Sequence, residues 1–327
     1  MTLSEIFDAF NGLNILIIGD VMIDSYLWGK VDRISPEAPV PVVNLKSREK
    51  RLGGAANVVM NVKALGCNPI LCSVVGADSE ANDLKELLKE QNILQDGLIE
   101  SPNRVTTIKH RILAGSQHLL RIDSEMTQAI TEQESEKLIE KVKELTKKHQ
   151  IHAIIFEDYD KGVLTSQNIQ AIISLAKDKK IPTVVDPKKR NFLNYAGCTL
   201  FKPNLKELKE GLNTEVLLTE KSLTETFELL NAKMPVENVL ITLSEKGVFA
   251  KNYSQNHWIA AHPREIADVS GAGDTVVSIA AACFALRLPL FMTASLANLG
   301  GGLVCEYLGV VPVSKEKLFE EAKNIHF

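Results

Sequence analysis

The residues best suited to binding a ligand and doing chemistry lie in one ten-residue stretch, DVSGAGDTVV at 268–277. Gly271 and Gly273 bracket Ala272, so the backbone there can turn tightly and approach a ligand without an intervening Cβ atom. The apolar run that follows predicts a buried helix beginning at or just inside these glycines. The amides at a helix N-terminus lack partners within the helix and carry partial positive charge, so they could bind an anion.

Asp274 lies on the first turn of this predicted helix. A bound anion would repel its carboxylate, which makes Asp274 a poor phosphate ligand but a useful acceptor of the proton from an attacking hydroxyl group. An anion site beside a base is an arrangement suited to phosphoryl transfer. The alternative is an ordinary helix start in which Asp274 interacts with the helix dipole, and a lone GxGD sequence favours that alternative.

Two earlier stretches could bind a second ligand. ILIIGD at 15–20 predicts a parallel strand buried on both faces. Ligands of open α/β sheets bind at the carboxyl ends of strands, so Asp20 and Asp24 could accept hydrogen bonds from sugar hydroxyls, or could simply cap a turn. In RLGGAANVVMNVKALG, Gly54 precedes a helix and lets a ligand approach the backbone, while the Asn57 amide can donate and accept.

Apolar strand patterns alternate with helical patterns along the chain and predict a doubly wound, mainly parallel α/β sheet. Residues 104–123 differ, because two alternating segments flank Ala114-Gly115-Ser116, which is a hairpin signal. Together with residues 38–52 they predict a small antiparallel sheet outside the main one. No linker or repeat divides the chain, so we expect a single domain over residues 1–327.

The composition restricts the class of protein. A hydrophobic content of 45% allows a large core, and a formal net charge of −4 argues against a nucleic-acid or membrane-surface binder. The five cysteines are scattered without a CxxC pair, which predicts reduced thiols and a cytoplasmic protein. The seven histidines show no metal-ligand spacing such as HExxH. We expect residues 288–305, although poor in charge, to form a buried helix rather than a membrane span.

Both glycine-containing stretches resemble the signatures of the ribokinase-like (PfkB) family of sugar kinases. DVSGAGDT is similar to the C-terminal signature, with Ser270 where Thr is more usual, and GGAANVVMN is similar to the N-terminal one, with Val59 where Ala is more usual. The resemblance extends from about residue 15 to residue 309. It implies that Asp274 is the general base and that the amides of Gly271, Ala272 and Gly273 stabilise charge on the transferred group.

Within the family, GDVMIDSYLWG and RISPEAPVPV are most similar to kinases that phosphorylate D-glycero-D-manno-heptose 7-phosphate for lipopolysaccharide synthesis. The resemblance implies phosphorylation of the anomeric hydroxyl to the 1,7-bisphosphate. The residues that would orient the sugar are Asp20, Asp24, Gly54 and Asn57. Arg33 and Lys161 are candidates for the distal phosphate, although either could be a plain surface charge. Lys109, Arg111 and Lys188 are the next candidates. Another sugar kinase of this fold, or a non-catalytic sugar or nucleotide sensor, remains an alternative.

The resemblance also implies ATP and Mg²⁺ as cofactors. KPNLKE matches the family's NxxE element, in which Asn204 and Glu207 would organise the cation through water. The turn SEKG lies where family members line the nucleotide. The residues that would contact ATP there are Thr242, Ser244 and Gly247, with Asn298 near the adenine. Lys161 is the lysine of EDYDKG, a string similar to SDYxKG but with Glu157 in place of Ser.

Two further expectations concern assembly. Family members like this one use the small sheet as a lid over the sugar and often as a dimer clasp, which implies a homodimer through the lid. Many relatives continue into a nucleotidyltransferase domain that carries an HxGH motif. None of the seven histidines lies in such a motif, so we expect a kinase domain with no nucleotidyltransferase domain.

Overall fold

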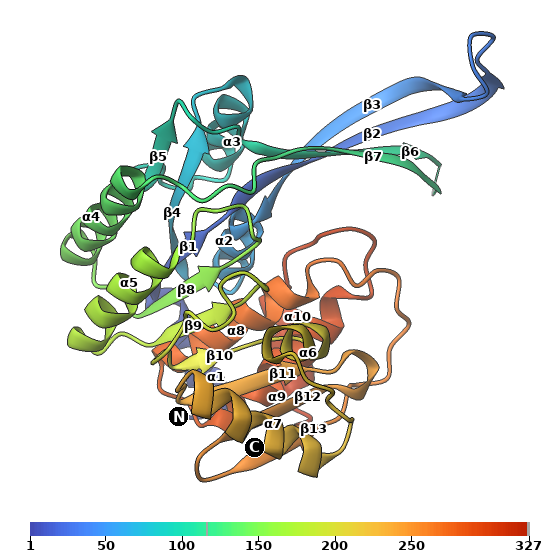
Figure 1. Ribbon diagram of the computed structural model, residues 1–327. Coiled ribbons are helices and arrows are strands. Elements are labelled where there is room, and N and C mark those ends of the chain that lie inside the picture. The colour runs from blue at the N-terminus through green and yellow to red at the C-terminus, as the bar shows by residue number, and fades with distance from the viewer. Residues whose placement is uncertain (116, 326–327) are drawn as a thin grey trace.

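The computed structural model describes residues 1–115 and 117–325 (Figure 1). Within these residues a nine-stranded sheet forms the centre of the molecule. In spatial order its strands are β13 (Asn256–Ile259), β12 (Val248–Asn252), β11 (Asn238–Thr242), β10 (Leu200–Phe201), β9 (Thr183–Asp186), β8 (Ala153–Glu157), β1 (Asn14–Gly19), β4 (Asn68–Gly76) and β5 (Leu98–Ser101). Strands β11 to β5 are parallel, and β12 and β13 form an antiparallel edge.

Helices cover both faces of this sheet. The helices that contribute to one face are α1 (Leu3–Ala9), α2 (Ala55–Ala64), α3 (Ser79–Glu90), α8 (Ala272–Ala285), α9 (Leu290–Val304) and α10 (Lys315–Ala322). The helices that contribute to the other are α4 (Glu132–Lys148), α5 (Ser166–Asp178), α6 (Leu205–Leu212) and α7 (Glu220–Lys233). Two short 3₁₀ helices are η1 (Phe10–Gly12) and η2 (Ser244–Lys246). The predicted doubly wound α/β fold is confirmed.

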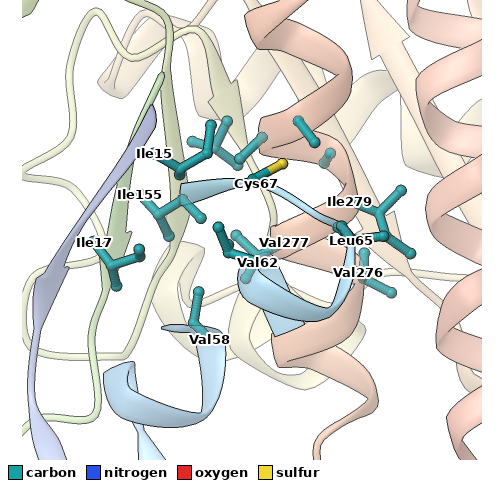
Figure 2. Packing of buried hydrophobic residues seen from close by; sticks show 14 of the residues in the cluster. Ile15, Ile17, Val58, Val62, Leu65, Cys67, Ile155, Val276, Val277 and Ile279 are labelled. Carbon is teal, nitrogen blue, oxygen red and sulfur yellow. The ribbon is translucent and has the colours of Figure 1, made fainter. Parts of the chain in front are cut away.

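The central strands are continuously apolar because both of their faces are buried. Successive side chains on a strand point to opposite faces, and β1 shows the result. Ile15 and Ile17 join the hydrophobic cluster under α2 and α8, whereas Leu16 joins the cluster on the other face. Figure 2 shows Ile15 and Ile17 beside Val62 of α2 and Val277 of α8. The parallel sheet therefore holds α2 and α8 at fixed positions on one of its faces.

A second sheet extends away from the main one and is called the lid here (Figure 1). In spatial order its strands are β3 (Pro41–Gly54), β2 (Val21–Ile34), β6 (Thr107–Ala114) and β7 (Gln117–Ser124). The predicted strands at 38–52 and 104–123 are present. β2 is an additional strand that the sequence analysis did not place in the lid, and it pairs parallel to β6 rather than antiparallel. Ser116 of the predicted hairpin turn lies outside the described residues.

The lid leaves the main sheet after β1 and returns to it at α2. Val21 pairs with Gly54, and the amide of Ala55 donates to the carbonyl oxygen of Asp20 over 3.0 Å. Gly54 has a φ of +58°, and a Cβ atom there would lie 2.4 Å from that carbonyl oxygen. Only glycine fits without distortion. Both ends of the β2–β3 hairpin of the lid are thus anchored at the carboxyl end of β1.

The helix expected within residues 288–305 is present as α9, which has 15 residues and is largely buried. Among the residues that the structure describes, no helix is both long and apolar enough to cross a membrane.

Candidate active site

Asp274 lies in the first turn of α8 and is buried. Its Oδ2 atom accepts a 2.6 Å hydrogen bond from Nδ2 of Asn57, and its Oδ1 atom accepts one of 2.9 Å from the hydroxyl of Tyr159. Gly271, just before the helix, has a left-handed φ of 81°, so the glycine permits the tight entry into α8. The structure therefore brings the two glycine-containing motifs together around one carboxylate.

The environment of Asp274 makes it a stronger base than an exposed aspartate. Burial raises the pKa of Asp274 to about 6, and the negative charge of Asp186 acts in the same direction. The hydrogen bonds from Asn57 and Tyr159 favour the ionised form and oppose the increase. A carboxylate with a pKa near 6 is mostly ionised at neutral pH, yet it accepts a proton more readily than an ordinary aspartate does.

Two further carboxylates lie beside Asp274. Glu157 ends β8 and Asp186 ends β9, and one oxygen from each lies within 4.8 Å of the others and of an Asp274 oxygen. Nζ of the buried Lys202 lies 2.9 Å from Oδ2 of Asp186. Sequence reasoning gave Glu157 and Lys202 no role in the site. The only available signal was their position at the ends of buried parallel strands, where ligands of such sheets bind.

Asn204 and Glu207 form a capping box at the start of α6. The Asn204 side chain accepts from the Glu207 amide over 2.8 Å, and Oε2 of Glu207 accepts from the Asn204 amide over 2.8 Å. Oε1 of Glu207 also accepts a 2.6 Å bond from Lys188, whose ammonium lies 3.4 Å from Oδ1 of Asp186. The NxxE element thus has a structural role, and it is linked through Lys188 to the carboxylates near Asp274.

A cavity of about 730 Å³ opens beside the start of α8. Its size suits a nucleotide-sized ligand. The predicted site residues that line it are Thr242, Ser244, Gly247, Ala272, Gly273 and Asn298. Asn298 is held in place because its Nδ2 atom donates a 2.8 Å bond to the carbonyl oxygen of Ala260. Sequence reasoning missed the segment 261–266, several residues of which also line this cavity. That segment has no regular structure and no motif that could have revealed it.

Asp20 orders the loop that follows β8. Its two carboxylate oxygens accept backbone hydrogen bonds of 2.8, 3.1 and 3.0 Å from Tyr159, Lys161 and Val163. Three of roughly four acceptor positions are therefore already used. Burial raises the pKa of Asp20, and these backbone bonds oppose the increase. Asp20 accordingly holds Tyr159 and Lys161 in place, a role that the sequence analysis did not predict.

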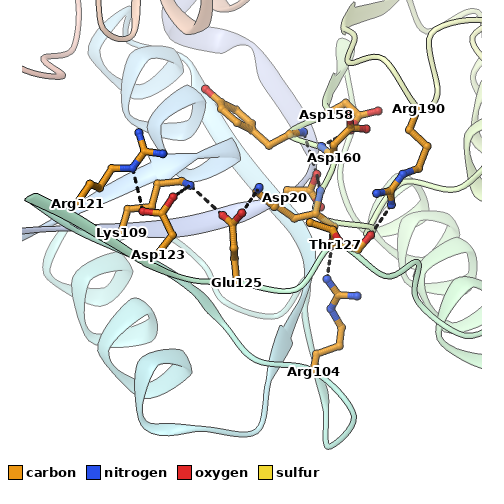
Figure 3. Close-up of polar contacts among 12 residues, drawn as sticks. Asp20, Arg104, Lys109, Arg121, Asp123, Glu125, Thr127, Asp158, Asp160 and Arg190 are labelled. Carbon is orange, nitrogen blue, oxygen red and sulfur yellow. Dashed lines mark hydrogen bonds and ion pairs between the residues drawn. The ribbon is translucent and has the colours of Figure 1, made fainter.

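Lys161 lies in a polar network at the base of the lid. Figure 3 shows two other members of this network, Glu125 and Lys109, joined by a dashed line. Its ammonium lies 2.7 Å from Oε1 of Glu125, and the ammonium of Lys109 lies 2.9 Å from Oε2 of the same side chain. Nearby, Asp24 forms an ion pair with Arg111. Each of these basic groups faces an acidic one within the described residues, so an incoming anion would compete with Glu125 or Asp24.

Two guanidinium groups lie close to the ring of Tyr26. The Cζ atoms of Arg51 and Arg111 lie 4.8 and 5.4 Å from the centroid of its ring, which is cation–π distance. Arg51 was not assigned to the site from the sequence, and Arg111 was a reserve candidate for the distal phosphate. Arg33, a first candidate, is exposed near the far end of β2. It lies nine positions beyond Asp24 along the extended strand, or roughly 30 Å at about 3.3 Å per residue. Within one chain the structure does not bring Arg33 to the other site residues.

The comparisons with known proteins agree with this geometry. The profile described as pfkB family carbohydrate kinase matches residues 13–317. The bifunctional protein HldE of Aliarcobacter butzleri is 41% identical over 315 residues, and that of Geotalea uraniireducens is 36% identical over 326 residues. These matches cover 96% and 99% of this chain but 65% and 66% of the relatives, so the chain spans about two thirds of their length.

Solved structures show the same fold. Phosphofructokinase-2 from Escherichia coli, in complex with potassium, matches with a TM-score of 0.78 and 18% identity, covering 95% of this chain and 99% of that one. Ribokinase from Arabidopsis thaliana, in complex with ribose and ATP, matches with a TM-score of 0.70 and 15% identity, covering 94% and 99%. From the family match over nearly its whole length, the chain belongs to the pfkB family of carbohydrate kinases and is a sugar kinase.

Proposed function

We propose that this kinase transfers the γ-phosphoryl group of ATP to the anomeric hydroxyl of D-glycero-D-manno-heptose 7-phosphate, forming the 1,7-bisphosphate. The observation that carries the proposal is the position of Asp274, a buried base next to a helix start that lines a nucleotide-sized cavity. The choice of acceptor is supported by the likeness to the HldE proteins and by the stretches that resemble heptose-7-phosphate kinases.

In the proposed reaction Asp274 accepts the proton of the acceptor hydroxyl as its oxygen attacks the γ-phosphorus of ATP. The bond from the γ-phosphorus to the bridging oxygen breaks, and ADP leaves. The amides of residues 271–273 are proposed to stabilise charge that develops on the transferred group, because they lie at the start of α8, where the helix carries partial positive charge. The amide of Ala272 also donates a 3.3 Å bond to the carbonyl oxygen of Val269. Asn57 holds the carboxylate in the orientation that this transfer requires.

The cavity beside α8 is the proposed ATP site, with Thr242, Ser244, Gly247 and Asn298 in contact with the nucleotide. Mg²⁺, when bound with ATP, supplies positive charge against the phosphates. Glu207 fits a water-mediated role, since its oxygens each accept one hydrogen bond and keep further acceptor capacity for water. Asn204 fixes the orientation of Glu207 through the capping box.

The acceptor sugar is proposed to lie between Asp274 and the base of the lid, in contact with Asp24, Gly54 and Asn57. Lys161 and Arg111 are proposed to bind its distal phosphate. Both carry positive charge near the anchored end of the lid, and each is paired with a carboxylate that a phosphate could replace.

The lid is proposed to join two copies of the chain. Several large apolar side chains on its strands and on the loop at its tip are exposed by 43 to 60%: Ile34, Val40, Leu45, Leu120 and Ile122. The outer strands of the lid also present unpaired backbone groups, which proteins usually cover. The simplest way to cover both the apolar side chains and the outer strands is a symmetric contact with the lid of a second copy of the chain.

Release of ADP across a panel of free and phosphorylated sugars tests the proposal. We expect the highest kcat/KM with heptose 7-phosphate, and a phosphorus NMR signal from an anomeric phosphate in the product. A clear preference for another sugar or sugar phosphate would overturn the choice of acceptor but leave the sugar kinase assignment intact.

A further inference from the structure

One wall of the cavity proposed to hold ATP is formed by the segment 261–266, which has no regular secondary structure. The backbone is fixed just before this segment, where the carbonyl oxygen of Ala260 accepts a 2.8 Å hydrogen bond from Asn298. It is fixed again just after it, where the amide of Ala267 donates a 2.8 Å bond to the carbonyl oxygen of Cys305 at the end of α9. Between these two anchors the segment has no helix or strand pattern of hydrogen bonds, so side-chain contacts must set its position.

Arg264 supplies such a contact from the middle of the segment. Its side chain is 6% exposed, and its guanidinium group forms ion pairs with Glu306, on the turn after α9, and with Glu321, in the last turn of α10. Both terminal nitrogens engage Glu321, since Nη1 lies 3.4 Å from Oε1 and Nη2 contacts Oε2. This is the bidentate geometry in which an arginine binds a carboxylate most strongly.

The charges around Arg264 are balanced. Lys317 of α10 also pairs with Glu306, so two cations face the two carboxylates. Within the described residues Nε of Arg264 is buried without a hydrogen-bond partner, and it lies so close to α9 that a Cβ atom on Gly302 would be 3.1 Å from it. Gly302 itself lines the cavity. The guanidinium group thus joins the cavity wall, α9 and α10 at one point.

This contact is sensitive to the loss of a partner. When one member of a buried ion pair is removed, the remaining charge loses its compensation, which costs far more than the loss of a surface pair. α10 is also attached to the core through Leu318 and Ala322, which belong to the same hydrophobic cluster as residues of α9. Loss of the Glu321 charge should therefore leave α10 packed but free Arg264, and with it the segment 261–266, from one of its two carboxylates.

We propose that Arg264 is a positioning residue for the nucleotide, which holds the segment 261–266 against α9 and α10 and so couples the C-terminal helix to the affinity for ATP. The inference rests on the proposed function in placing ATP in this cavity, and it does not depend on the identity of the sugar acceptor. Because coupling between two sites is reciprocal, bound nucleotide should in turn make α10 more rigid.

The first test is calorimetry on the purified full chain with MgCl₂ and the non-hydrolysable ATP analogue AMP-PNP, in the absence of sugar. Glu321→Gln removes the charge of the bidentate partner and should raise the Kd at least about fivefold, the lower end of usual couplings between linked sites. The KM for the sugar should remain nearly constant. Glu320→Gln makes the same chemical change at the neighbouring position of α10, where the side chain pairs with Lys323 on the surface, and should leave the Kd unchanged.

Amide hydrogen exchange separates a positioning role from general stabilisation. In nucleotide-free Glu321→Gln, residues 261–266 should exchange faster than in the wild type and in Glu320→Gln. In the wild type, AMP-PNP should slow exchange in α10, and Glu321→Gln should reduce this protection.

Arg264→Gln should show the same changes, and adding Glu321→Gln to it should weaken AMP-PNP binding no further, because both substitutions break the same contact. If Arg264→Gln does not fold, as judged by thermal unfolding, Glu321→Gln decides the question alone, since its carboxylate is 33% exposed and its loss is better tolerated.

Equal AMP-PNP affinity in Glu321→Gln and Glu320→Gln would overturn the inference. A lower melting temperature of Glu321→Gln without a change in Kd would also overturn it, because Arg264 would then have a structural role only. Asn298→Ala alters a proposed nucleotide contact and identifies which proposal has failed. If Asn298→Ala weakens AMP-PNP binding and Glu321→Gln does not, this inference alone is refuted. If neither weakens it, the cavity is not the ATP site and both proposals fall.

Discussion

The side-chain amide of Asn57 donates a 2.6 Å hydrogen bond to Asp274, although the two residues are 217 positions apart in the chain. α2 carries the amide and α8 carries the carboxylate, and both helices pack on the same face of the sheet. Tyr159, on the loop after β8, donates to the other oxygen of the carboxylate. The proposed base is thus oriented by two separate segments, and its position depends on the packing of the whole sheet.

Asp274→Asn should reduce turnover by roughly 10²–10⁴-fold, the usual effect of removing a general base. The amide has nearly the same shape as the carboxylate, so folding and ATP binding should remain. Stopped-flow or steady-state ADP release, together with ATP binding by calorimetry, checks both expectations. Near-normal turnover by a correctly folded variant would remove Asp274 from the mechanism.

The pH dependence of kcat/KM should report the ionisation of Asp274. The base acts only when ionised, and burial raises the pKa of Asp274 to about 6. The rate should therefore be constant near neutral pH and fall about tenfold per pH unit below that pKa. A profile that stays flat down to pH values near 4 would contradict the raised pKa or the role of the residue.

Tyr159→Phe should move this acidic limb to higher pH. The hydroxyl of Tyr159 donates to Oδ1 of Asp274 and lowers the pKa of that carboxyl, so removing the hydroxyl should raise the pKa further. The effect on kcat/KM should consequently be larger at pH 6 than at pH 8. A uniform loss at every pH would indicate a structural role only. Tyr253→Phe, which removes a hydroxyl from an exposed tyrosine, is the matched control.

Lys161→Ala and Arg111→Ala should weaken binding of the phosphorylated acceptor selectively. A charge-assisted contact to phosphate is worth about 1.5–3 kcal/mol, which is roughly 10- to 150-fold in KM. The KM for ATP should remain nearly constant. Arg33→Ala is the comparison variant, because within one chain the Arg33 side chain lies far along β2 from Asp24 and the other site residues. If both Lys161 and Arg111 variants bind the phosphorylated acceptor as the wild type does, the distal phosphate lies elsewhere.

Replacement of Leu120 and Ile122 by Lys should shift the protein toward monomer. Both side chains are about half exposed on β7 of the lid, so the substitutions should cost little stability in an isolated chain. Light scattering at micromolar concentration should show a dimer for the wild type and a smaller species for the variant. A wild type that is monomeric at these concentrations would contradict the proposed contact.

Local sequence was sufficient to predict the parts of the fold that depend on local physics. Apolar runs such as β1, and the glycines before α2 and α8, indicated the doubly wound sheet and the helix starts. β2 was missed as a lid strand because it mixes polar and apolar residues, and because its pairing partner β6 lies far away in the chain. Parallel pairing over such a separation has no local signal.

The candidate site likewise depends in part on contacts between distant segments, which local sequence does not predict. Asp274 and Asn57 were identified from motifs, and their contact follows from helix packing. Glu157 and Lys202 were not assigned to the site from the sequence. Both lie close to Asp186 only because β8, β9 and β10 are neighbours in the sheet, and this strand order has no local signal. The capping box of Asn204 and Glu207 is readable from the sequence, but the ion pair between Glu207 and Lys188 is not.

The anchoring of the lid has a consequence for how its length can vary. The amide of Ala55 and the carbonyl oxygen of Asp20 are 3.0 Å apart, so the chain leaves and re-enters the main sheet at nearly the same point. Opposed residues of β2 and β3 could be added or removed in pairs, and this junction would keep its geometry. The reach of the β2–β3 hairpin is therefore separable from the candidate site at the carboxyl end of the sheet, because the hairpin can change in length while its junction with β1 and α2 stays in place.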